Sequence, residues 1–171
     1  MQVTRTRALR GPNLWSRRTA IEAVVICDPA ERDLHSTPVF EQHLRELFPG
    51  VGALHANKPS TPISMAHALE LTALALQAQA GCPVTFSRTT PTEVEGTFQV
   101  AVQYTEEAVG RLALVKAEQL CRAAAEGGSF EGQTVKQARK DVKAALAEKG
   151  LERGSKPHSL MLPRCQRCNT V

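Results

Sequence analysis

The string HALEL, residues 67–71, carries the residue pair most typical of metal chemistry. His67 and Glu70 are three residues apart, so in a helix they lie side by side. Zinc peptidase helices of the H-x-x-E-H type use two histidines as ligands and the glutamate as general base. Here Leu71 stands where the second histidine belongs, and a leucine cannot bind zinc. Two interpretations stay open: a His–Glu hydrogen bond satisfied inside the core, or an incomplete zinc site with Glu70 as base and His67, Glu106 and Glu107 as ligands.

A second group of chemically active residues surrounds the string RALRGPNLWS, residues 7–16. It contains five arginines and the only tryptophan of the chain: Arg5, Arg7, Arg10, Trp15, Arg17 and Arg18. Guanidinium groups bind carboxylates and phosphates, so the group predicts an anion-holding surface; the alternative is a solvated edge. For Trp15 we expect either a ring that pins the returning strand to the core or an exposed ring that stacks on cationic ligands.

The cysteines offer little chemistry. Cys165 and Cys168 form one C-x-x-C pair, which is half of a zinc ribbon, and the sequence has no second pair. We therefore predict no role for them. The five cysteines follow no disulfide framework, which is typical of a reducing compartment and favours a cytoplasmic protein.

Composition excludes several classes of function. The chain has 171 residues, 42% of them hydrophobic but only 4% aromatic, so Ala, Leu and Val must build the core. The net charge of +4 is too small to indicate nucleic acid, and basic patches with interleaved aromatics are absent. No apolar run is long enough for a membrane helix, and no phosphate-binding glycine motif occurs.

Hydrophobic periodicity and turn residues place these motifs on elements. We predict strands over 1–11 and 19–28, a helix over 38–48, a long helix over 61–81, strands over 83–90 and 96–104, and helices over 105–128 and 134–150. Thr61 and Pro62 predict the start of the long helix, and Gly81 its end. The order β-β-α-α-β-β-α-α indicates an α+β fold with helices packed on a mixed or antiparallel sheet. Residues 1–150 would form one domain, and 151–171 a disordered, basic tail.

Three segments, in the same order, resemble the N-terminal part of cyanophycin synthetases. RALRGPNLWS resembles that family's R-G-P-N-x-W/Y-S signature, which follows a strand. HALELTALALQAQAGCPVTFSRT resembles its H-x-x-E-H-x-A-L-E-L-Q segment, and VAVQYTEEAVGRLALVKAEQLCRA resembles its E-Y-x-E-E-x-x-G-R-x-A helix entry. The resemblance runs from residue 4 to about residue 124.

The resemblance implies a function. Members of the family are multidomain ligases that build poly-aspartate with arginine on each side-chain carboxylate, using ATP and Mg²⁺ in ATP-grasp and Mur-ligase-like domains that this chain lacks. It implies that this chain is a truncated or stand-alone N-terminal domain, a non-catalytic scaffold that binds cyanophycin, without a cofactor of its own. The polymer-binding candidates are then Arg5, Arg7, Arg10, Trp15, Arg17 and Arg18.

The same resemblance leaves alternatives and further partners. Some members use the H-x-x-E-H helix as a metal-dependent peptidase that trims the polymer. His67 and Glu70 match that motif, Leu71 and Ala75 depart from the family pattern, and Glu106 and Glu107 match its later acidic positions. The chain could also be a non-functional gene fragment. Besides cyanophycin, the expected partners are separate ligase domains or a second copy of the chain, with no nucleic acid or membrane.

Overall fold

A four-stranded antiparallel sheet forms the base of the fold. In this computed structural model, which describes residues 1–31, 64–125 and 132–151, the strands are β1 (Gln2–Leu9), β2 (Ala20–Ile26), β3 (Ser87–Pro91) and β4 (Thr97–Gln103). They lie in the order β1-β2-β4-β3, and every neighbouring pair is antiparallel. The predicted α+β class is confirmed, with an antiparallel rather than a mixed sheet.

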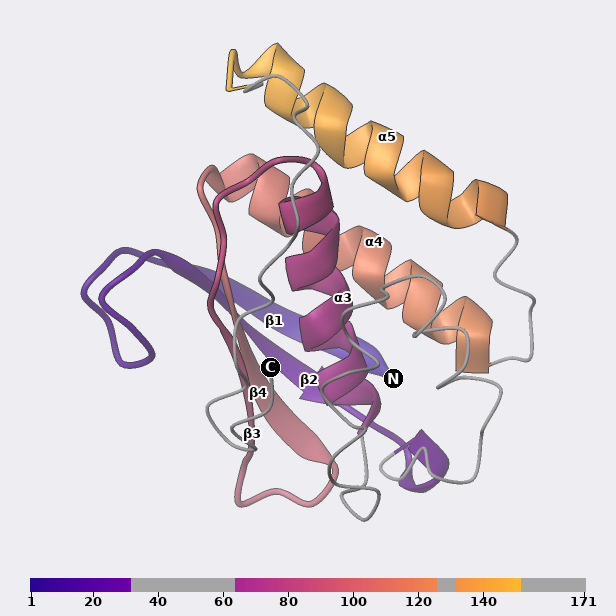
Figure 1. The fold of residues 1–171 in the computed structure, drawn as a ribbon. Helices are drawn as coiled ribbons and strands as arrows, with labels where there is room; N and C mark the ends of the chain where they lie inside the picture. The colour runs from indigo at the N-terminus through magenta and orange to yellow at the C-terminus, as the bar shows by residue number, and fades with distance from the viewer. Residues whose placement is uncertain (32–63, 126–131, 152–171) are drawn as a thin grey trace, which may run out of the picture.

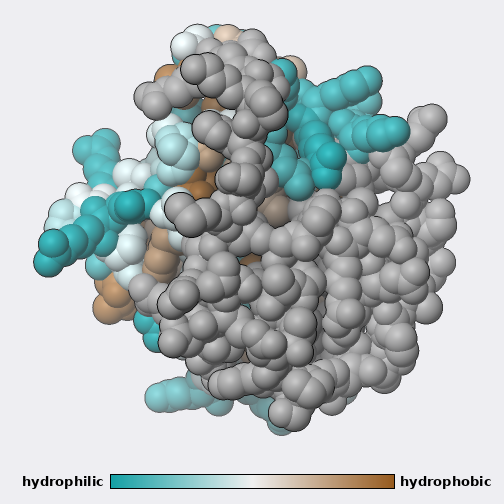
Figure 2. Space-filling model, viewed as in Figure 1, coloured by the Kyte–Doolittle hydropathy of each residue, from teal (hydrophilic) through white to brown (hydrophobic). Residues whose placement is uncertain are grey.

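Helices cover one face of this sheet in two layers. α3 (Met65–Gln79) packs on β3 and β4, and α4 (Glu107–Ala125) packs beside it; α5 (Gly132–Glu148) lies across both helices on the side away from the sheet (Figure 1). A short 3-10 turn, η1 (Pro29–Glu31), follows β2. On the face seen in Figure 2, hydrophilic side chains gather over α5 and over the projecting β1–β2 loop. The helix predicted over 38–48 and the tail from residue 152 lie outside the described residues.

Strand alternation determines which side chains enter the core. Ile21, Ala23 and Val25 of β2 and Val100 and Val102 of β4 are buried against the helices. The helices contribute Met65, Leu69, Leu76, Val109, Ala113 and Leu120. Twelve residues of α3 are buried, so this helix is covered on more than one side. Many of the buried residues of α3 are alanines, whose small side chains let the helix pack close to the sheet. Close packing is needed because the chain has few aromatic side chains to fill a wider core.

Two predicted boundaries are wrong for identifiable reasons. The long helix starts at Met65 with Ser64 as its N-cap, because the Ser64 hydroxyl accepts a hydrogen bond from the His67 backbone N–H at 3.3 Å. The third strand starts at Ser87 and not at Pro83. The Gln103 side chain bonds the preceding segment instead: its Oε1 accepts from the Thr85 N–H at 3.0 Å.

Gly110 lets the first turn of α4 pack against the end of the sheet. A Cβ at this position would lie 2.7 Å from the Cβ of Tyr104 and 2.9 Å from Cδ1 of Ile21, closer than side-chain atoms approach. The glycine therefore sets how near α4 lies to β2 and to the residue that follows β4.

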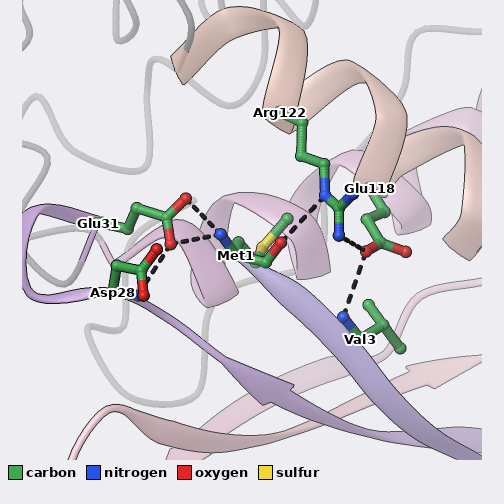
Figure 3. Close-up of polar contacts among 6 residues, drawn as sticks. All are labelled: Met1, Val3, Asp28, Glu31, Glu118 and Arg122. Atoms are coloured by element: carbon green, nitrogen blue, oxygen red, sulfur yellow. Dashed lines mark hydrogen bonds and ion pairs between the residues drawn. The ribbon is translucent and has the colours of Figure 1, made fainter.

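Polar contacts fasten the start of β1 to α4 and η1 (Figure 3). Glu118 accepts a hydrogen bond from the Val3 N–H at 3.2 Å, and the Arg122 guanidinium donates to the Met1 carbonyl at 3.0 Å. The Met1 ammonium group forms an ion pair with Glu31. These contacts hold β1 at the sheet edge although most of its side chains are exposed.

Candidate functional site

The outer face of the sheet, turned away from α3 and α4, carries the polar strand residues. Pairing places Arg5, Val24, Gln99 and Thr90 in one row across the four strands. The next row contains Arg7, Glu22, Ala101 and Arg88. Arg5 and Arg7, two of the predicted ligand-binding residues, thus lie on the same surface of the sheet. The carboxylate of Glu22, on the neighbouring strand β2, lies on that surface as well.

A shallow hollow of about 220 Å³ opens on this face. Arg5, Arg7, Glu22, Val24 and Gln99 line it, and we call it the arginine hollow. Two guanidinium groups and one carboxylate leave it a net charge of +1. A hollow of this charge favours anions, and its polar lining provides several hydrogen-bond donors.

Glu22 is the centre of the polar contacts in the arginine hollow. Its Oε1 accepts a hydrogen bond from Nη2 of Arg7 at 3.0 Å, and its Oε2 accepts one from Nε1 of Trp15 at 2.8 Å. The Glu22 side chain is only 13% exposed, whereas that of Arg7 is 56% exposed. Trp15 does hold the returning strand β2, but through Glu22 on the outer face rather than through the core.

The β1–β2 loop is built to fix Trp15 in this position. The Asn13 side chain accepts from the backbone N–H groups of Trp15 and Ser16, at 2.9 and 3.0 Å. It also donates to the carbonyls of Arg10 and Arg18, at 3.1 and 2.8 Å. A Cβ at Gly11 would lie 2.3 Å from the carbonyl oxygen of Arg17, so only glycine permits this close crossing of the two loop arms.

The remaining arginines of the predicted group have different surroundings. Arg10 and Arg17 are exposed on the loop beside Leu14, which is 88% exposed. Arg18 donates through Nη1 to the hydroxyl of Thr85 and to Oε1 of Gln103, the second at 3.3 Å. Arg18 therefore ties the loop to β4 and the segment before β3, while Arg10 and Arg17 extend the basic surface away from the arginine hollow.

His67 and Glu70 lie together at the other side of the sheet. Nδ1 of His67 and Oε2 of Glu70 are 3.0 Å apart, and the same oxygen accepts a hydrogen bond from the hydroxyl of Thr89 on β3. Glu70 is 3% exposed. A buried carboxylate must be hydrogen-bonded to remain in the core, and this pair satisfies that requirement.

Glu107 is the first residue of α4, and Glu106 directly precedes it. Oε1 of Glu107 accepts a hydrogen bond from Nε of Arg111 at 2.8 Å, one turn further along the helix. Within residues 1–31, 64–125 and 132–151, no group of three or more His, Cys, Asp or Glu side chains could hold a metal ion. In this part of the chain, His67 therefore has Glu70 beside it but not the two glutamates of α4.

The described cysteines are buried and weakly acidic. Burial raises the pKa of the Cys27 thiol to about 11 and that of Cys82 to about 11, and it raises the pKa of Cys121 to about 12. A thiol with such a pKa is protonated at neutral pH and is a poor nucleophile or metal ligand. Cys165 and Cys168 lie outside the described residues.

Several contributors to these sites were not predicted from the sequence, among them Val24, Gln99, Arg88 and Thr89. Gln99 could have been found, because alternation from the apolar residues Val100 and Val102 assigns it to the outer face. Thr89 and Arg88 required knowledge of which strands are neighbours. Among the described helices, none is long and apolar enough to cross a membrane.

Comparison with known proteins identifies the family. The family model for the cyanophycin synthase-like N-terminal domain matches residues 24–126. A cyanophycin synthetase from Crocosphaera subtropica is 30% identical over 165 residues, covering 88% of this chain and 19% of that protein. Those from Synechocystis sp. and Geminocystis herdmanii are 31% and 32% identical, covering 76% and 88% of this chain and 16% and 19% of theirs. The chain spans less than a fifth of these relatives, in which it corresponds to the N-terminal region, and it belongs to the cyanophycin synthase-like N-terminal domain family.

Proposed function

We propose that this chain is a non-catalytic binding module that holds cyanophycin on the outer face of the sheet. The observation that carries the proposal is the arginine hollow, a surface depression of about 220 Å³ lined by Arg5, Arg7 and Glu22. Hydrogen bonds hold the Glu22 carboxylate in place there. The curated relatives are named cyanophycin synthetases, so the polymer is the natural candidate ligand.

The chemistry of the polymer supports this assignment. Cyanophycin, as the family resemblance implies, presents carboxylates and guanidinium groups at regular intervals along a peptide backbone. The arginines of this surface can pair with the carboxylates of the polymer, and Arg88 on β3 continues the positive charge across the sheet. The exposed Arg10 and Arg17 of the loop extend the same surface, so one polymer chain can contact several positions at once.

The test is retardation of the purified chain by soluble cyanophycin in a native gel. We expect the wild-type chain to be retarded and the double variant Arg5→Ala/Arg7→Ala to be retarded much less. The matched control is Lys136→Ala/Lys140→Ala, which removes the same two charges from exposed positions on α5. If the control variant loses as much retardation as Arg5→Ala/Arg7→Ala, the effect depends only on net charge. If the wild-type chain is not retarded at all, the proposal is rejected and the gene-fragment alternative remains.

The same preparation tests the peptidase alternative. Glu70 already accepts a hydrogen bond from the Thr89 hydroxyl and lies beside His67, which suits a structural role. We therefore expect cyanophycin incubated with the chain and zinc to keep its length in mass spectrometry. Polymer shortened by the wild-type chain but not by Glu70→Gln would establish the peptidase instead.

A further inference from the structure

The two arginines of the arginine hollow differ in whether they have an ion-pair partner. Nη2 of Arg7 lies 3.0 Å from the Glu22 carboxylate, and this ion pair neutralises one of the two positive charges of the arginine hollow. In the part of the chain that the structure describes, the guanidinium of Arg5 has no ion pair or hydrogen bond with another residue. The uncompensated charge of the hollow is therefore at Arg5, which lies beside Val24 on β2 and in the same row as Gln99 on β4.

In contrast to Arg5, Glu22 already has a hydrogen-bond partner on each of its carboxylate oxygens. Each of its oxygens holds one donor, Arg7 on Oε1 and Trp15 on Oε2, and its side chain is 13% exposed. A cation arriving from solvent would have to compete with both donors and displace one of them. An anion meets no such competition, because the donors of Arg5 and the amide of Gln99 face the hollow without an acceptor among the described residues.

We propose that the arginine hollow is a binding site for a carboxylate group. Arg5 is its principal donor, the Gln99 amide is a second donor, and Glu22 neutralises the charge of Arg7 and repels a bound carboxylate. About 220 Å³ corresponds to roughly seven water molecules, which is room for a carboxylate and a few carbon atoms. The carboxylate can come from a small free acid or from the polymer; for the second source the proposal rests on the proposed function.

The chain's single tryptophan provides the measurement. The indole N–H of Trp15 gives one proton–nitrogen NMR signal, and its hydrogen bond to Glu22 makes that signal sensitive to the hollow. We expect sodium succinate to move the Trp15 signal saturably, and sodium chloride or methylguanidinium chloride of equal ionic strength not to move it. A saturable shift with methylguanidinium alone would overturn the proposal. Tighter binding of inorganic phosphate than of succinate would replace carboxylate by phosphate as the ligand class.

Variants that remove a charge from the arginine hollow test whether the bound group is negatively charged. Arg5→Gln should abolish the succinate-dependent shift. Glu22→Gln keeps an acceptor for Trp15 but removes the negative charge, so succinate should bind about three- to tenfold more tightly. Lys140→Gln, which removes one positive charge from an exposed position on α5, is the matched control and should bind like the wild type. Undiminished binding in Arg5→Gln, or weaker binding in a folded Glu22→Gln, would refute the assignment. If Glu22→Gln does not fold, the comparison of Arg5→Gln with Lys140→Gln decides.

The two proposals fail in different ways. If succinate binds at Arg5 but cyanophycin does not retard the chain, the carboxylate site stands and the proposed function is wrong. If cyanophycin retards wild-type and Arg5→Gln chains equally, the polymer is bound elsewhere and the arginine hollow is not its site; the succinate titration then decides the carboxylate site by itself.

Discussion

At the scale of single residues, the hydrogen bond from Trp15 to Glu22 explains why the only tryptophan stands in a turn. The ring is half-buried against the outer face and its Nε1 lies 2.8 Å from Oε2 of Glu22. We predict that Trp15→Phe, which keeps the ring but loses this donor to a largely buried carboxylate, lowers the free energy of unfolding by about 1–2 kcal/mol. Urea denaturation followed by circular dichroism measures this. Arg17→Ala, an exposed change two residues away, should lower it by no more than about 0.5 kcal/mol.

Asn13 is the residue that shapes the loop. Its side chain makes four hydrogen bonds to the loop backbone, two as acceptor and two as donor. We predict that Asn13→Ala costs about 2 kcal/mol, since several partly exposed bonds of modest individual strength are lost together. Asn13→Asp retains the acceptor role and should lie between Ala and wild type in the same urea measurement. Equal loss in both variants would mean that the donated bonds alone hold the loop.

The buried thiols predict a pH dependence of stability. The thiol of Cys82 has a pKa near 9.0 when unfolded and about 11 when buried, so between these values the unfolded chain releases its proton and the folded chain does not. Unfolding is then favoured as pH rises, and stability should fall by about 1.4 kcal/mol per pH unit for this group over pH 9–11. Comparing denaturation of the wild type and Cys82→Ala across this range isolates the effect. Parallel curves for the two proteins would contradict it.

Single residues also show how far the sequence could predict the site. Arg5, Arg7 and Trp15 can be named as ligand-binding candidates from the sequence because of their residue types and their place beside a turn, and their role in binding stays a prediction. Their division into an arginine hollow and a separate loop surface was not predictable, since it depends on the strand register and on the carboxylate that Arg7 contacts. Thr89 was equally hidden, because 19 residues separate it from Glu70.

At the scale of elements, the close packing of α4 on the end of the sheet depends on Gly110. Alanine is the better helix former by about 1 kcal/mol, so propensity alone predicts that Gly110→Ala stabilises α4. We predict the opposite, a loss of about 2 kcal/mol or more, because the added Cβ would lie 2.7 Å from the Cβ of Tyr104. Thermal unfolding measures the sign. Gln119→Ala, at an exposed position of the same helix, should change stability by less than about 0.5 kcal/mol.

Elements were predictable where one local rule applied and not where two competed. β2 and the apolar body of α3 follow from their hydrophobic patterns. The start of α3 did not, since both Thr61-Pro62 and Ser64 are acceptable N-terminal signals and tertiary contacts select between them. The start of β3 was misplaced because Gln103, far away in sequence, satisfies the backbone that a strand would otherwise have used.

At the scale of the whole molecule, the question is whether α5 is an integral layer or an appended helix. The family match ends at residue 126, before this helix begins. Yet α5 buries Ala138, Val142 and Leu146 in the same core cluster as α3 and α4, and Lys116 of α4 pairs with Asp141 at 2.7 Å. Shared burial of this kind couples the unfolding of neighbouring elements.

We predict that Leu146→Ala, which empties a 3%-exposed position, destabilises the entire domain by about 2–4 kcal/mol. Trp15 is in the projecting β1–β2 loop, whereas α5 lies in the outer helix layer (Figure 1), so tryptophan fluorescence and helical circular dichroism report on different parts. Both signals should shift together to lower urea, while Lys140→Ala, exposed on α5, should shift neither. A circular dichroism transition that moves while the fluorescence transition stays would show that α5 unfolds on its own, and that the sheet with its arginine hollow is stable without it.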